Sequence, residues 1–268
     1  TPNPCVMCNE LLKFGKLWSK AAALGANYIA TGHYAIIEHR EEGVRLRKGR
    51  DARKDQSYFL FSLSQEQLGR ALTPLGGMTK PEIRDLARDL GLRVADKADS
   101  QEICFVPGNS YREFLRSHLG DDKFHRGGIY TTEGTRLGEH EGIELFTIGQ
   151  RKGIPGGSPQ PLYVVDIDPR TSRVIVGAQD ELVDDEFEVN RSNWLVSSSE
   201  IPGKLTAKIR YSHPGTPATV QPLDGGRARV RLEVPQRAIT PGQAAVFYDG
   251  DRVVGGGWIA RKRAVGNY

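Results

Sequence analysis

Apolar side chains near the start of the chain follow helical spacing and then strand-like spacing. Five residues mark one face of a helix by the i, i+3, i+4, i+7 rule: Leu11, Phe14, Trp18, Ala21 and Ala22. Asn9 is a candidate cap for this helix and Gly25 a candidate stop. The apolar run 27–31 is then predicted to be a short buried strand, so the two elements form half of an α/β repeat.

Two further elements in this region have clear end signals. The stretch 34–48 is predicted to be a β-hairpin with its turn near Glu41-Glu42-Gly43. Thr79-Lys80-Pro81-Glu82 has the pattern of a capping box. It predicts a helix that runs to Leu90, with Gly91 at its C-terminal stop. Residues 1–106 are therefore predicted to form a mixed α/β domain.

The pattern changes after residue 107. A last short helix is predicted over 111–119, and Gly/Pro turns then separate β-rich runs. The predicted strands are 162–167, 173–176, 205–211, 218–222, 228–234, 244–248 and 252–258. Hairpin-type turns lie at Asp224-Gly225-Gly226 and Asp249-Gly250-Asp251. Because five or six short antiparallel strands end the chain, we predict a small barrel over 183–262 and a small mixed central domain over 107–182.

Composition narrows the class of protein. Of 268 residues, 38 % are hydrophobic and 26 % charged, a balance typical of a soluble globular chain rather than a disordered or membrane-embedded one. No apolar run approaches the roughly 18 residues of a membrane-spanning helix. The net charge of +4 is compatible with nucleic-acid binding without being diagnostic of it. An odd number of cysteines, three, argues against a secreted disulfide scaffold and favours the reducing cytoplasm.

The cysteines lie in two short polar segments, 1–9 and 98–105. Cys5 and Cys8 form a Cys-x-x-Cys, a spacing compatible with half of a zinc site, a thioredoxin-like pair or a structural role. We expect Cys8 at a helix N-terminus, where the helix dipole favours a thiolate.

The third cysteine has a different setting. Asp99 and Glu102 precede Cys104, and two nearby carboxylates disfavour a thiolate. A small buried apolar role is therefore the alternative to a reactive one for Cys104. If Cys8 and Cys104 face each other, they form a two-thiol centre suited to sulfur chemistry.

Two polar segments of the first domain are candidate ligand sites. Gly32 and His33 follow the predicted strand 27–31, and a glycine there lets a nucleotide approach the backbone at the carboxyl end of a sheet. His33 is either part of that site or an ordinary hydrogen-bonded histidine. Lys54-Asp55-Gln56-Ser57-Tyr58 is either an ordinary loop or a holder of a phosphate and a base edge.

The β-rich part carries three further candidates. Arg210 is suited to contact a phosphate and Tyr211 to stack on a base, with a solvated strand face as the alternative. The basic, glycine-bounded loop 147–153 is either a contact to phosphate or RNA backbone or a plain turn. Gln243, in a turn that enters a strand, offers its amide to a base or to the backbone.

Seven segments, in order and spread over essentially the whole chain, resemble the bacterial tRNA-specific 2-thiouridylases (MnmA type). They are TPNPCVMCN, ANYIATGHYA, RKDQSYFL, ADSQEICFVP, FTIGQRKG, KIRYSH and RAITPGQAAVFYDGDRVVGGGWI. The resemblance implies a fold of α/β followed by β: part of a PP-loop ATP-pyrophosphatase domain, a central tRNA-binding domain and a C-terminal antiparallel β-barrel. It also implies an enzyme, a tRNA-uridine 2-sulfurtransferase. Such an enzyme adenylates the C2 oxygen of a wobble uridine with ATP and replaces it with persulfide sulfur, giving 2-thiouridine, AMP and pyrophosphate.

The resemblance also assigns roles to residues. It implies that Cys8 is the nucleophile and Cys104 the carrier of the persulfide, and that the two can form a disulfide when sulfur leaves. It implies that Gly32 contacts ATP and that Asn3, Pro4 and Cys5 meet the target base, although an Asp stands at the position of Cys5 in some members. The remaining implied tRNA contacts are His33, Lys54, Asp55, Gln56, Arg210, Tyr211 and Gln243.

The implied partners are tRNA and a sulfur-donor protein, either a cysteine desulfurase or a relay protein, with ATP and Mg²⁺ and no membrane. The family's glycine/serine-rich PP-loop precedes the TPNPC motif, and the 268 residues contain nothing like it. We therefore expect an N-terminally truncated fragment that is inactive alone. Two other classes stay open. A non-catalytic RNA-binding module would need neither cysteine, and another PP-loop enzyme, such as an amidotransferase-type synthetase, is disfavoured by the two thiol motifs.

Overall fold

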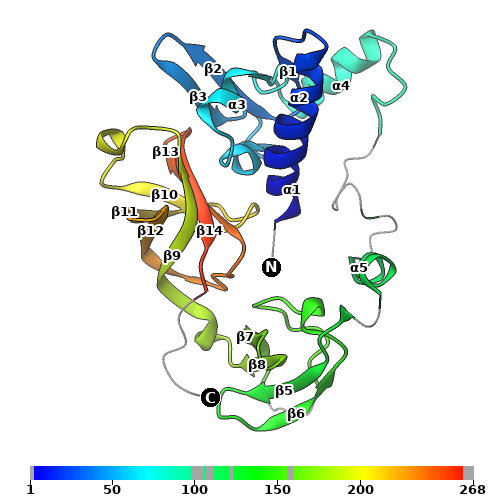
Figure 1. The fold of residues 1–268 in the computed structure, drawn as a ribbon, viewed down its shortest axis with the longest axis vertical. Helices are drawn as coiled ribbons and strands as arrows, with labels where there is room; N and C mark the ends of the chain where they lie inside the picture. Colours follow the sequence, from blue (N-terminus) through cyan, green and yellow to red (C-terminus); the bar gives the residue numbers. More distant parts are fainter. Residues whose placement is uncertain (1–2, 98–105, 107–110, 121–122, 156–159, 262–268) are drawn as a thin grey trace.

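The computed structural model describes residues 3–97, 106, 111–120, 123–155 and 160–261. It has three units (Figure 1): an α/β unit at the N-terminus, a central unit at the opposite end of the molecule, and a β-barrel that lies against the first unit. The segment that carries Cys104 lies outside the described residues. No helix among the described residues is long and apolar enough to cross a membrane.

One helical rod opens the first unit. It consists of α1 (Pro4–Met7), the π-helical η1 (Cys8–Leu17) and α2 (Trp18–Ala23). Asn3 caps it, since its Oδ1 accepts a hydrogen bond from the backbone N–H of Val6 at 3.4 Å and Pro4 occupies the first helical position. The prediction that Asn9 is the cap is therefore wrong. The predicted stop is confirmed, because Gly25 has φ +84° just after the last turn.

The rest of the first unit is small. β1 (Ile29–Ala30) pairs in parallel with β4 (Ala71–Leu72), and the predicted hairpin is confirmed as β2 (Ala35–Arg40) and β3 (Gly43–Lys48). η2 (Ser57–Leu60) and α3 (Gln65–Gly69) follow. α4 (Lys80–Asp89) begins as predicted, because the Glu82 carboxylate accepts hydrogen bonds from the Thr79 backbone N–H at 2.7 Å and from its hydroxyl at 2.9 Å.

The central unit is a four-stranded sheet with one helix. α5 (Tyr111–Leu119) is the predicted helix. The sheet has the order β6-β5-β8-β7 and consists of β5 (Gly127–Thr131), β6 (Arg136–His140), β7 (Tyr163–Asp168) and β8 (Arg173–Gly177). Two short 3-10 helices follow strands of this unit: η5 (Ile143–Leu145) comes after β6, and η6 (Asp180–Leu182) leads from β8 to the barrel. Ile129, Val164 and Val174 form the centre of its core.

Six strands close into the predicted barrel. They are β9 (Val183–Trp194), β10 (Leu205–Lys208), β11 (Thr216–Leu223), β12 (Arg227–Arg237), β13 (Ala244–Asp249) and β14 (Arg252–Ile259). Their order is β13-β10-β11-β12-β9-β14, and the β13–β14 pairing closes the ring. A one-turn helix, η7 (Ser198–Glu200), lies between β9 and β10. β10 ends at Lys208 rather than at the predicted 211, so Arg210 and Tyr211 lie in the loop that follows it.

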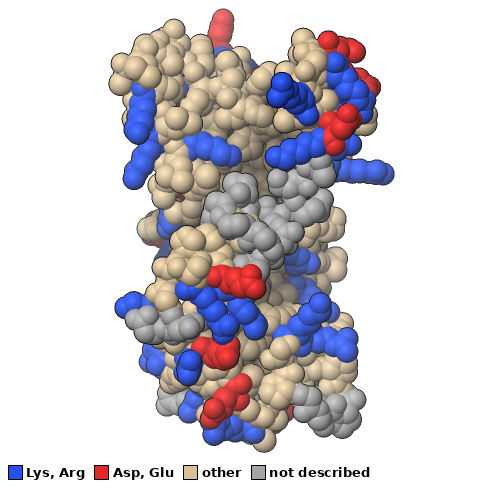
Figure 2. Space-filling model, turned by 90° about the vertical axis from the view of Figure 1, so that its right-hand side faces the viewer, with Lys and Arg blue, Asp and Glu red and all other residues tan. Residues whose placement is uncertain are grey.

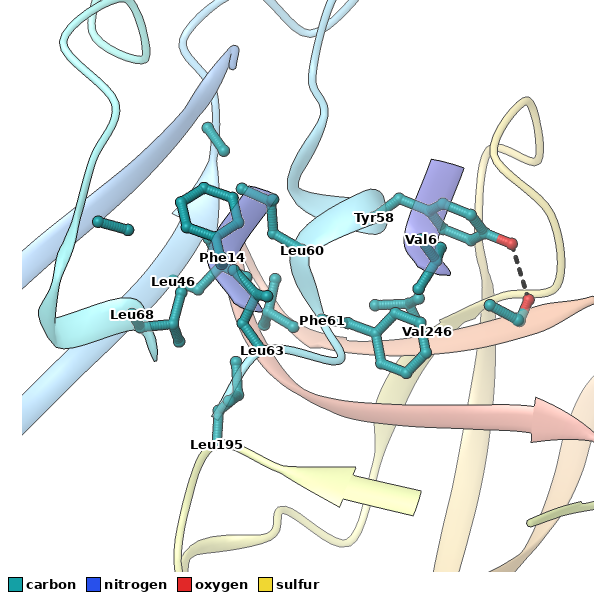
Figure 3. Packing of buried hydrophobic residues seen from close by; sticks show 14 of the residues in the cluster. Val6, Phe14, Leu46, Tyr58, Leu60, Phe61, Leu63, Leu68, Leu195 and Val246 are labelled. Atoms are coloured by element: carbon teal, nitrogen blue, oxygen red, sulfur yellow. Dashed lines mark hydrogen bonds between the residues drawn. The ribbon is translucent and has the colours of Figure 1, made fainter. Parts of the chain in front are cut away.

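The barrel and the first unit share one hydrophobic core. β3 joins the barrel sheet by pairing with β14 at Arg47 and Arg252. Figure 3 shows how Tyr58 and Phe61 from η2 and its end pack beside Val246 of β13, with Leu195 below them. These side chains are almost completely buried. The two units are therefore held together by packing, although the whole central unit separates them along the chain.

Candidate functional site

The segment Asn3-Pro4-Cys5 lies at the junction with the barrel. The hydroxyl of Tyr58 donates a hydrogen bond to the carbonyl of Ala244 in β13 at 2.8 Å, drawn as the dashed line in Figure 3. The side chain of Asn3 also bonds to Tyr58. Burial raises the pKa of Tyr58 above its ordinary value. The hydroxyl therefore stays protonated and remains a hydrogen-bond donor in a fixed position. The start of the cysteine-bearing helix is thereby tied to the barrel.

The two described cysteines lie along that helix. Cys5 and Cys8 are both half-buried, and they form no disulfide with each other. The backbone N–H of Cys8 is already bonded to the carbonyl of Pro4, so Cys8 lies in the second turn and its predicted place at the helix N-terminus is wrong. Because the dipole effect is confined to the first turn, any activation of the Cys8 thiol must come from another source.

Gly32 and His33 have opposite exposures. Gly32 is exposed just past the end of β1, and a Cβ there would meet only Leu75 Cδ1, at 3.6 Å. His33 is buried, with its Nδ1 2.8 Å from the Thr31 hydroxyl and its ring 6.2 Å from that of Phe14. Burial, assisted by the charge of Lys13, lowers the pKa of His33 to about 4. The imidazole is therefore neutral at physiological pH, beside a backbone position that is open to a ligand.

The loop of residues 54–56 is fixed from within. Asp55 is buried, and its Oδ1 accepts hydrogen bonds at 3.0 Å from the backbone N–H groups of Gly49 and Ser57. Its Oδ2 accepts the Ser57 hydroxyl at 3.0 Å. Gln56 Oε1 accepts the backbone N–H of Tyr34 at 3.0 Å. The carboxylate of Asp55 thus shapes the loop, and Lys54, next to it, is the residue of the three that carries a positive charge.

The barrel loop after β10 lies against this part of the first unit. The ring of Tyr211 stands 4.4 Å from that of Phe59 and 6.0 Å from that of Tyr58, measured between centroids. Arg210 is close enough for its charge to act on Tyr58. Tyr58 and Phe59 therefore join Asn3 to the Arg210–Tyr211 pair. Sequence reasoning gave neither aromatic this role, although Tyr58 is the last residue of the polar cluster that it singled out and Phe59 follows directly.

Gln243 lies at a second junction, between the barrel and the central unit. With Arg210 it lines a cavity of about 450 Å³. The other lining residues are Thr147, Ile148, Gly149, Ile209, Arg237, Ala238 and Thr240. Arg210 donates through Nη1 to the carbonyl of Arg237 at 3.3 Å. Two guanidinium groups and the glycine-bounded loop predicted to contact RNA thus surround one cavity.

The site residues predicted from the sequence therefore form three connected groups. Three groups meet around the Tyr58–Phe59 pair: Asn3 with Cys5 and Cys8, the 54–56 loop, and Arg210 with Tyr211. Gln243 extends this surface toward the central unit. Gly32 and His33 lie on the first unit, where the His33 ring packs near Phe14 of η1. Cys104 lies outside the described residues.

Comparisons with known families cover all three units. Residues 1–108 match the model of the tRNA methyl transferase HUP domain, 112–178 that of the tRNA methyl transferase PRC-barrel domain, and 184–259 that of the aminomethyltransferase beta-barrel domain. The matches agree with an α/β unit, a small central unit and a six-stranded antiparallel barrel in this order. The expected fold class is confirmed.

Among the relatives are enzymes named tRNA-specific 2-thiouridylase MnmA. The one from Geobacter metallireducens is 51 % identical over 260 residues, which are 97 % of this chain and 70 % of the relative. One from Caldanaerobacter subterraneus is 51 % identical over 98 % of this chain and 72 % of its own length, and one from Moorella thermoacetica is 50 % identical over 97 % and 73 %. Identity of this degree along nearly the whole chain shows that it belongs to the tRNA-specific 2-thiouridylase family.

Proposed function

We propose that this chain is part of a tRNA-uridine 2-sulfurtransferase, which uses ATP and a persulfide to convert a wobble uridine to 2-thiouridine. The relatives' name supports the reaction class. One structural observation carries the proposal for this chain: the helix that bears Cys5 and Cys8 starts at Asn3, which is bonded to Tyr58, and the barrel residues Arg210 and Tyr211 gather on the same side chain. The helix that bears the two thiols thus begins beside a surface formed by Arg210 and the aromatic rings, which is suited to an unstacked base.

The roles of the thiols follow from the chemistry of oxygen replacement. ATP, when bound, supplies the adenylation that turns the C2 oxygen of uridine into a leaving group. The terminal persulfide sulfur on Cys104 attacks C2 and AMP departs with that oxygen. The Cys8 thiolate then attacks the sulfur–sulfur bond, so the sulfur stays on the base and Cys8 and Cys104 form a disulfide. Two external thiol equivalents must reduce this disulfide before the next cycle.

Among the described residues, Gly32 is the position that suits the approach of a nucleotide. Gly32 is exposed past the end of β1 with no side chain crowding its backbone except Leu75, which suits close approach of ATP. Mg²⁺ is expected with the phosphates. The glycine/serine-rich loop that would hold them is not among the 268 residues, so we expect the polypeptide 1–268 to show no thiolation when supplied alone.

The contacts to tRNA are those that the family resemblance implies. Asn3, Pro4 and Cys5 are assigned to the target base, and His33, which is buried and neutral, is assigned to the tRNA-facing side near the nucleotide. Lys54 and Arg210 offer charges to phosphates, Tyr211 offers a stacking surface, and Gln56 and Gln243 offer amides. Asp55 acts by holding its loop in shape. A sulfur-donor protein completes the set of partners, and we place the reaction in the cytoplasm with tRNA.

Substitution of single cysteines tests the proposal. The chain is expressed with an upstream PP-loop segment and supplied with ATP, tRNA and a sulfur donor, and 2-thiouridine is measured by nucleoside mass spectrometry. Cys8→Ser and Cys104→Ser should each abolish thiolation, because each removes one of the two thiols that pass the sulfur. Gly203→Ala is the control and should retain it, because a Cβ at this position meets nothing within 4 Å. Thiolation that survives Cys8→Ser or Cys104→Ser removes that residue from the mechanism, and tRNA binding without any thiolation would favour a binding module instead.

A further inference from the structure

A second basic cavity lies on the first unit, apart from the Tyr58–Phe59 pair. It has a volume of about 430 Å³ and lies between residues 51–54 and the first turns of α4. Its charged lining residues are Asp51, Arg53, Lys54, Lys80, Arg84, Asp85 and Arg88. Figure 2 shows the face of the molecule on which α4 lies, where Lys and Arg side chains are spread from top to bottom with Asp and Glu side chains among them.

The carboxylates of this cavity are already committed. Asp51 accepts the backbone N–H of Arg53 at 3.1 Å through Oδ1 and that of Lys80 at 3.0 Å through Oδ2. Asp85 pairs with Arg88 at 2.7 Å, and Arg88 also pairs with Asp96 at 2.8 Å. Asp51 also interacts with the charges of Lys54 and Arg53. In the part of the lining that the structure describes, basic side chains outnumber carboxylates: Arg53, Lys54, Lys80, Arg84 and Arg88 against Asp51 and Asp85.

Arg84 gives an independent sign that an acceptor is missing. Its Nε is buried, and it has no hydrogen-bond partner among the described residues. A buried N–H donor without an acceptor costs about 1–3 kcal/mol, so in native structures such a group is nearly always completed by protein, water or an ion. An oxyanion in the cavity would accept this hydrogen bond and would suit the mainly basic lining.

The neighbouring loop indicates which anion this is. Lys54 lines the cavity and also begins the 54–56 loop, to which the proposed function gives a tRNA contact. Arginine and lysine gathered in an open, polar cavity suit phosphodiester groups, which receive half or more of the hydrogen bonds in protein–nucleic acid interfaces. We propose that the cavity between residues 51–54 and α4 binds a backbone phosphate of the tRNA, with Arg84 and Arg53 as its principal ligands. This inference rests on the proposed function, because it takes tRNA as the substrate.

Salt-dependent binding tests the site. The chain with its upstream PP-loop segment is titrated into fluorescein-labelled tRNA at several salt concentrations, for wild type, Arg84→Gln and Arg53→Gln. Each substitution should weaken binding about 3- to 10-fold and lower the slope of log K against log salt by about 0.7–0.9, the contribution of one phosphate contact. Arg84→Lys keeps the charge and should keep most of the slope.

The control is Arg229→Gln, which removes one positive charge from β12, where Arg229 faces Glu186 and Glu188. It should leave the slope unchanged. Thermal unfolding of every variant shows whether the fold is kept. Slopes and affinities equal to wild type in folded Arg84→Gln and Arg53→Gln would overturn the phosphate site, whereas a wild type that fails to bind tRNA would overturn the proposed function itself. Weakened binding of ATP with unchanged binding of tRNA would assign the cavity to nucleotide phosphates and also overturn the proposal.

Discussion

Burial controls the charge of His33. Its ring is 8 % exposed and lies against Phe14, with the Thr31 hydroxyl as its polar neighbour. Burial, then the charge of Lys13, lowers its pKa to about 4 from an ordinary 6.5. The neutral ring can accept or donate a hydrogen bond beside Gly32, whereas a charged ring would carry an unbalanced buried charge.

This shift makes stability depend on pH. In the unfolded chain His33 takes up a proton near pH 6.5, and in the folded chain only near pH 4, so its contribution is complete above about pH 6.5 and is lost as the pH falls toward 4. The full loss is about 3 kcal/mol. Chemical unfolding at several pH values should show that His33→Gln has a flatter profile than wild type between pH 6.5 and 4. A difference in the free energy of unfolding between wild type and His33→Gln that stays constant over this pH range would contradict the prediction.

Among the elements, β14 owes its position to glycine. Gly255, Gly256 and Gly257 stand in succession in a strand that is buried nearly throughout. A Cβ on Gly256 would meet Phe61 Cδ2 at 2.5 Å and the carbonyl oxygen of Ala245 at 2.7 Å. The missing side chain is what lets the Phe61 ring approach this barrel strand so closely.

Gly256→Ala should therefore destabilise the chain. Neither the ring nor the strand can move far in a packed core, so we expect a loss of about 1–3 kcal/mol in the free energy of unfolding, measured in urea. Gly203→Ala is the matched control, because a Cβ there meets nothing within 4 Å, and it should change stability little. Equal stability of the two variants would show that the close contact is relieved by a small shift.

The helices and strands also show which elements can be predicted from the local sequence pattern. The hairpin β2–β3, helix α4 and the late strands have local signals: a turn with Gly43, a capping box at Thr79 and alternating apolar positions. Strands β5 and β6 have none: β5 begins with Gly127 and Gly128, which dilute its apolar pattern, and Leu137 is the one large apolar residue of β6. The predicted start of the first helix is too late. Its apolar face begins at Leu11, whereas its cap is Asn3, directly before Pro4. The meeting of Asn3 with Tyr58 and Tyr211 depends on contacts between distant segments, which no local pattern contains.

At the scale of the whole molecule, the chain leaves the first unit, forms the central unit and returns (Figure 1). The returning barrel is bound by polar as well as apolar contacts. Asn193 of β9 donates to the carbonyls of Phe61 and Leu63 at 2.7 and 3.0 Å, and Gln65 donates to the carbonyl of Leu195 at 3.0 Å. The proposed site is made of both units, so its geometry depends on this interface staying closed.

Phe61→Ala tests that dependence. Phe61 is completely buried beside Trp258 of β14, with ring centroids 6.3 Å apart. Removing the ring should cost about 3–5 kcal/mol and leave a cavity between the units. The barrel has its own core around Val189, Val230 and Phe247, so we expect the first unit to melt at a lower temperature while the barrel transition is retained, and tRNA affinity to fall because Tyr211 and Asn3 separate. Calorimetry and tRNA titration measure both effects, with Phe61→Leu as the milder control. A single transition that moves as a whole, with unchanged tRNA affinity, would show that the units unfold together and that the site does not need the ring.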